Sequence, residues 1–63
     1  MNFQLKLQNE RLENLNGQLA YSNEALSQTD IKSWEKKEFE ICKAKIINEI
    51  AECEALIKVI KSL

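Results

Sequence analysis

Apolar residues recur at intervals of three or four along the segment from Phe39 to Ile60. Because an α-helix has about 3.6 residues per turn, this spacing places them on one side of a helix. The stripe consists of Phe39, Cys42, Ile46, Ile50, Cys53, Ile57 and Ile60. The pattern predicts a helix with one apolar side, and the remainder of the chain is expected to cover that side.

The first part of the chain repeats with a period of seven, which predicts a helix over residues 2–26. One column contains Leu5, Leu12, Leu19 and Leu26, with Leu15 beside it. A second column contains Asn2, Asn9, Asn16 and Asn23. A whole column of asparagines is too polar for a dry seam between helices, so we expect it at the edge of the seam.

Between these segments, Ser27-Gln28-Thr29-Asp30 places a hydroxyl three residues before an acid, which is typical of an N-terminal capping box. Leu26 and Ile31 have the spacing of a hydrophobic staple around this cap. We therefore predict a hinge at 27–30 and a second helix over 28–62. Two alternatives remain: one uninterrupted rod through the hinge, or a break of the first helix at Gly17.

Folded back at the hinge, the two helices form an antiparallel hairpin in one all-α domain, residues 1–63. We expect Leu19 to face Phe39, Leu5 to face Cys53, and Gln8 to face Ile50. The predicted hairpin core is Leu5, Leu12, Leu15, Leu19, Leu26, Ile31, Phe39, Cys42, Ile46, Ile50, Cys53 and Ile57. In this register the second helix is about two turns longer than its cover, so Leu56, Ile57, Val59, Ile60 and Leu63 would protrude.

A second line of small or apolar residues follows the back of the second helix. Helices that are apolar on two sides are usually packed on two sides, so this line predicts an oligomer or partner interface. The line consists of Ile41, Ala44, Ala51, Ala55 and Val59. The predicted oligomer or partner interface adds Leu56, Ile60, Leu63 and Trp34 to it. We expect a dimeric four-helix bundle or a larger helical oligomer. Trp34 alternatively caps the end of the hairpin core.

Three further apolar side chains, Phe3, Leu7 and Tyr21, lie off the leucine column and have no predicted cover. They are candidate contacts to another protein. The predicted partners are thus a second copy of the chain and a different protein.

The small size of the chain strengthens the case for association. A core built from 63 residues rarely supplies more than about 3–5 kcal/mol, unless disulfides, metals or oligomerisation add to it. Cys42 and Cys53 lie about 16 Å apart on one helix, too far for a disulfide. Both are expected to be reduced core residues, and a disulfide between chains is the alternative. No apolar run has the length of a membrane span or the position of a signal peptide, so we expect a cytoplasmic protein.

The residue types argue against catalysis. The chain has no histidine to act as a general base near pH 7 and only one glycine, Gly17, so it has no phosphate-binding loop. We expect no enzymatic activity, no cofactor, no metal and no small-molecule substrate.

The sequence therefore predicts a protein–protein interaction module, acting as a small oligomeric adaptor, assembly factor or regulator. A stoichiometric inhibitor that blocks a larger target is one alternative. RNA binding is another, because a hairpin dimer such as the plasmid regulator Rop binds RNA with one helical face. The chain is similar to Rop in length and expected architecture and shares no motif with it. Its net charge of −1 argues against nucleic acid as the main partner.

Overall fold

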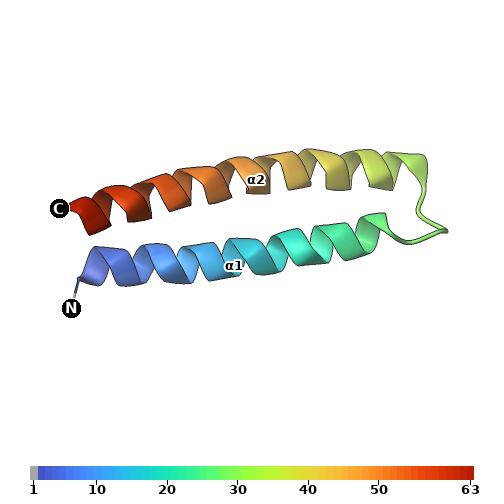
Figure 1. Ribbon diagram of the computed structural model, residues 1–63. Coiled ribbons are helices and arrows are strands. Elements are labelled where there is room, and N and C mark those ends of the chain that lie inside the picture. Colours follow the sequence, from blue (N-terminus) through green and yellow to red (C-terminus); the bar gives the residue numbers. More distant parts are fainter. Residues whose placement is uncertain (1) are drawn as a thin grey trace.

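The computed structural model describes residues 2–63 and is an antiparallel hairpin of two helices. Helix α1 spans Phe3–Leu26 and helix α2 spans Ser33–Ser62. The two helices pack along their length, and their free ends lie side by side at one end of the molecule (Figure 1). The prediction of an all-α hairpin is confirmed, and the uninterrupted rod is excluded.

Helix α1 begins one residue later than predicted because Asn2 acts as its N-cap. The Asn2 side-chain oxygen accepts hydrogen bonds from the backbone N–H groups of Gln4 and Leu5, at 3.0 and 3.3 Å. These bonds satisfy two of the four N–H groups that the start of a helix leaves without a partner. The helix then runs through Gly17 without a break, so the alternative of a turn at that residue is excluded.

Gly17 is therefore a weak point in α1 rather than a structural requirement. A Cβ atom added there would meet no atom within 4 Å. We expect Gly17→Ala to raise the free energy of unfolding by about 1 kcal/mol, because alanine restricts the unfolded chain and favours the helix. Thermal melts at one fixed protein concentration should show a midpoint higher by about 5 °C. A lower midpoint would contradict the uncrowded helical position of Gly17.

The predicted capping box at the hinge is wrong. The Ser27 hydroxyl donates a 2.6 Å hydrogen bond back to the carbonyl of Glu24, and Ser27 keeps a right-handed helical backbone conformation. Ser27 thus ends α1 instead of starting α2. Helix α2 begins five residues later than predicted, at Ser33, and its N-cap residue Lys32 makes no side-chain capping bond.

The core is a single line of contacts between the two helices. Leu15, Ile46, Cys53 and Ile57 are buried, and Leu5, Leu12, Leu19 and Ile50 pack against them. Leu26, Ile31 and Phe39 are half-buried towards the hinge. Four buried hydrophobic side chains form a small core even for a chain of this length.

The later start of α2 also shifts the register of the hairpin. Gln8 faces Cys53 rather than Ile50: the Cys53 thiol donates to the Gln8 backbone carbonyl at 3.1 Å and lies 3.4 Å from its side-chain oxygen. Near the hinge, Phe39 meets Tyr21 rather than Leu19. Sequence analysis missed Ser22, which is buried one heptad after Leu15.

The shifted register shortens the predicted overhang at the end of α2, where Leu56, Val59 and Leu63 are exposed. Ile57 is buried in the core and Ile60 is half-buried, so neither residue protrudes. The six residues by which α2 exceeds α1 correspond to about 9 Å, and α2 extends past α1 at the hinge (Figure 1). The long axis of the molecule measures 47 Å.

Candidate binding surfaces

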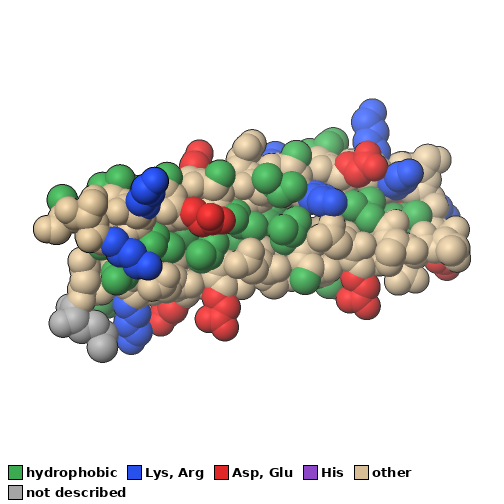
Figure 2. Space-filling view, viewed as in Figure 1, with side chains coloured by type: hydrophobic (Ala, Val, Ile, Leu, Met, Phe, Trp, Pro, Cys, Tyr) green, Lys and Arg blue, Asp and Glu red, His purple; other side chains and the backbone are tan. Residues whose placement is uncertain are grey.

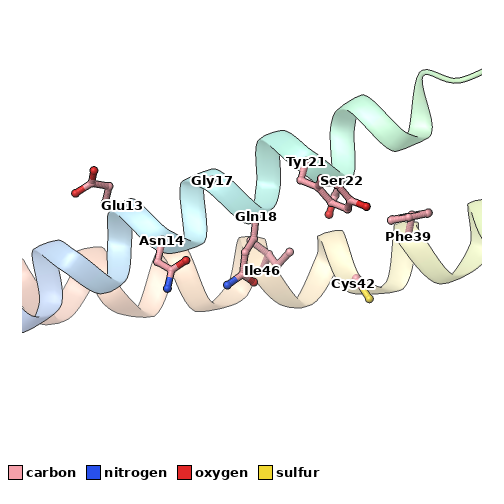
Figure 3. A pocket seen from close by; sticks show the side chains of 9 residues that line it. All are labelled: Glu13, Asn14, Gly17, Gln18, Tyr21, Ser22, Phe39, Cys42 and Ile46. Carbon is pink, nitrogen blue, oxygen red and sulfur yellow. The ribbon is translucent and has the colours of Figure 1, made fainter.

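An open groove follows the contact between α1 and α2 on one side of the hairpin (Figure 3). We call it the aromatic groove. Tyr21 of α1 and Phe39 of α2 lie in it with ring centroids 6.3 Å apart and ring planes tilted by 56°. The groove has a volume of about 530 Å³ and is lined by Glu13, Asn14, Gly17, Gln18, Tyr21, Ser22, Phe39, Cys42 and Ile46.

The aromatic groove continues along α2 towards the hinge. A second hollow of about 250 Å³ shares Phe39 and Cys42 with it and adds Trp34, Glu35 and Glu38. The Trp34 side chain lines this hollow. Because it is 62% exposed, it does not cap the hairpin core. Three carboxylate side chains line the two hollows, those of Glu13, Glu35 and Glu38, and neither lysine nor arginine does. The continuous groove is therefore apolar at its base and acidic at its edges.

Cys42 was predicted to be a core residue, and this prediction is wrong. Its side chain lines the aromatic groove (Figure 3) and is exposed. Cys53, in contrast, is fully buried. Both thiols are free. Cys42 lies at the edge of the apolar stripe of α2, about 40° from Ile46 around the helix axis, and α1 does not cover that edge.

This difference between the thiols has a measurable consequence. We expect a thiol reagent to modify Cys42 at the rate of an exposed cysteine and Cys53 only when the hairpin opens. In the Cys42→Ser variant only Cys53 can react, so its slow modification is measured alone. Denaturant should accelerate this modification. Equal native rates for the two cysteines would contradict the burial of Cys53.

A second candidate surface is the side of α2 that points away from α1. We call it the outer face of α2. Its large members, Ile41 and Val59, are 50% and 56% exposed, and its three alanines are also exposed. The outer face comprises Ile41, Ala44, Asn48, Ala51, Ala55 and Val59, which recur every three or four residues.

The other predicted contact residues are distributed around these two surfaces. Leu56 and Leu63 are exposed near the free end of α2, beside the outer face. Phe3 and Leu7 are exposed on α1, on the same side of that helix as Tyr21. Sequence analysis missed Ile47, which is 47% exposed although its neighbour Ile46 is in the core.

The side of the molecule shown in Figure 2 differs from the aromatic groove. Lysine, arginine, aspartate and glutamate side chains are scattered over it, with apolar side chains between the two helices. A shallow hollow on the hairpin combines Glu54 with Lys58 and Lys61. The hollow thus combines charges of both signs and is not part of a continuous basic surface.

Within residues 2–63, no group of three histidine, cysteine, aspartate or glutamate side chains is placed to hold a metal ion. Across the same residues, neither helix combines the length and apolar character that crossing a membrane requires. Comparisons of the chain with models of known protein families, with curated proteins and with solved structures find no match.

Proposed function

We propose that the protein is a non-enzymatic interaction module that associates with itself through α2 and binds a second protein in the aromatic groove. The observation that carries this proposal is the excess of uncovered apolar side chains. Among the described residues, nine large apolar side chains are exposed, whereas the buried core contains four hydrophobic residues. Exposed apolar surface of this extent is typical of association sites.

The total accessible surface supports the same proposal. The hairpin exposes 5063 Å². A compact monomer of its mass, 7.3 kDa, would expose about 4,200 Å². The excess of about 900 Å² is close to the area of about 800 Å² that one partner contributes to a standard protein interface. Association of two copies into a four-helix assembly would cover an area of this size.

The aromatic groove indicates the chemistry of the second protein. Its apolar base, formed by Tyr21, Phe39 and Cys42, suits aliphatic or aromatic side chains. The carboxylates at its edges favour a segment that also carries lysine or arginine. We therefore propose an amphipathic, basic segment of another protein as the occupant. If that segment belongs to the active centre of its protein, the module acts as a stoichiometric inhibitor.

We propose that the protein acts in the cytoplasm, where an exposed thiol such as that of Cys42 stays reduced. The mixed charges around Glu54, Lys58 and Lys61 support a protein partner over RNA, because RNA binding favours a continuous basic face.

Binding in the groove can be tested with the full chain as bait in extracts of its source cells. We expect a protein to be retained by the natural chain and lost from Cys42→Arg, which places a bulky cation at the centre of the groove. Ala20→Arg, on an exposed part of α1 away from the groove, is the matched control and should retain the protein.

Circular dichroism of both variants checks that the hairpin is intact. Equal retention by the natural chain and Cys42→Arg would contradict binding in the groove. Recovery of RNA with a steep dependence on salt would favour the Rop-like alternative.

A further inference from the structure

The outer face of α2 lies midway between two rows of charged side chains. On the flank that also borders the aromatic groove, Lys45 and Glu52 are exposed, one heptad apart. On the opposite flank, Glu40 is exposed near the start of α2 and Lys58 near its end. Lys36, Glu54 and Lys61 lie further round the helix, towards α1. Among these four charges nearest the outer face, the sign in each row is reversed on the two sides of Asn48, the middle of a helix that spans Ser33–Ser62.

A surface whose charges reverse sign about its centre is complementary to itself after a rotation of 180°. We consider a rotation axis that passes near Asn48, perpendicular to the plane of the two α2 helices. This rotation brings Lys45 of one copy next to Glu52 of the other, and Glu52 of the first next to Lys45 of the second. The same rotation brings Glu40 next to Lys58 of the second copy. In such an antiparallel pair, each flank of one helix meets the same flank of the other, and the charges on these flanks determine the register.

We propose that a second copy of this chain covers the outer face of α2, with the two α2 helices antiparallel and crossing near Asn48. This inference rests on the self-association in the proposed function and adds its geometry. Ala44 of one copy then packs against Ala55 of the other, and Asn48 lies beside Ala51 at the axis. The small side chains let the helices approach closely.

Other arrangements of the same two faces are less favourable. A parallel pair would place Lys37 opposite Lys37 and Lys58 opposite Lys58, and like charges in such positions repel. An antiparallel pair shifted by one heptad would place Lys45 opposite Lys45 of the second copy, and these like charges repel. The register centred near Asn48 also overlaps the two 30-residue helices along their whole length.

The arrangement produces a single layer of four helices, in the order α1, α2, α2, α1. Because the rotation axis is perpendicular to this layer, the aromatic grooves of both copies open on the same side of it. The interface thus leaves both grooves free for a second protein.

Charge reversal tests the register. We expect Lys45→Glu and Glu52→Lys each to raise the dissociation constant of the dimer about tenfold, since each change creates two like-charge contacts. The double variant Lys45→Glu with Glu52→Lys restores both pairs and should return the constant to within about twofold of the natural protein. Lys6→Glu, exposed on α1, is the matched control and should leave it unchanged. Sedimentation equilibrium over a concentration series measures each constant, and circular dichroism checks the hairpin.

The possible results separate this inference from the proposed function. A natural protein that stays monomeric at about 100 μM would overturn self-association and its geometry together. If both single variants weaken the dimer and the double variant does not recover, the register is wrong while self-association stands. Neither result affects the test of the aromatic groove, which uses Cys42→Arg.

Discussion

We expect Ile46→Asp to unfold the hairpin. Ile46 is 9% exposed and lies in the core with Leu15 and Cys53. An aspartate there would bury a charge without a partner and remove an apolar side chain, which together cost more than about 4 kcal/mol. A core of this size supplies only about 3–5 kcal/mol, so little net stability would remain. Far-ultraviolet circular dichroism should show loss of the helical signal at room temperature.

The neighbouring residue provides a matched control for this result. Ile47→Asp makes the same chemical change one position along α2, where the side chain is 47% exposed. We expect this variant to keep its helical signal, with a thermal midpoint lowered by only a few degrees. If both variants retain equal helicity, the hairpin does not depend on the core around Ile46.

The second large effect is expected at Ala51, on the outer face of α2. In the proposed dimer, Ala51→Glu would bring two carboxylates into a closely packed region beside the axis. We expect the dissociation constant of the dimer to rise by about a hundredfold or more. The hairpin itself should be unaffected, because Ala51 is exposed in the single chain and glutamate is a good helix former.

Light scattering would show the loss of mass, and circular dichroism at the same concentration would show the retained helices. Ala20→Glu makes the same change at an exposed position of α1 and should leave the mass unchanged. A dimer that tolerates Ala51→Glu must be held together by another surface, for which the aromatic groove is the next candidate.

The architecture could be predicted because it depends on periodicity. The stripe around Ile46 and Ile50 and the leucine column from Leu5 to Leu26 each mark one side of a helix, and two such sides in a short chain cover each other. Backbone continuity through Gly17 was also predictable, since the leucine column crosses it without a change of phase.

The hinge could not be predicted from the sequence pattern, because the Ser27 side chain can form a hydrogen bond with either the preceding or the following helix. A serine hydroxyl can accept from the N–H groups of a following helix or donate to a carbonyl of the preceding one. In the structure it donates to Glu24, so the loop extends to Lys32. The resulting shift changed the pairing of Gln8 and Phe39 and shortened the predicted overhang.

The candidate surfaces were only partly predictable, because exposure depends on how far α1 covers the stripe of α2. Cys42 belongs to the stripe by its spacing, yet it lies at the edge that α1 leaves open. Ser22 is the opposite case, a polar residue that the geometry of the seam buries. Periodicity identifies the side of a helix on which a residue lies, whereas the neighbouring helix decides how much of that side is covered.

The two helices differ at their beginnings, and this has a consequence for their motions. Asn2 holds the first turn of α1 with two hydrogen bonds, whereas the first turn of α2 has no side-chain cap and lies where α2 extends past α1. Transient fraying should therefore be concentrated in the turn that carries Trp34, and amide protons there should exchange with solvent fastest among the helical ones. The tryptophan beside the groove thus lies on the segment of the protein that can adjust its shape most readily to a bound ligand.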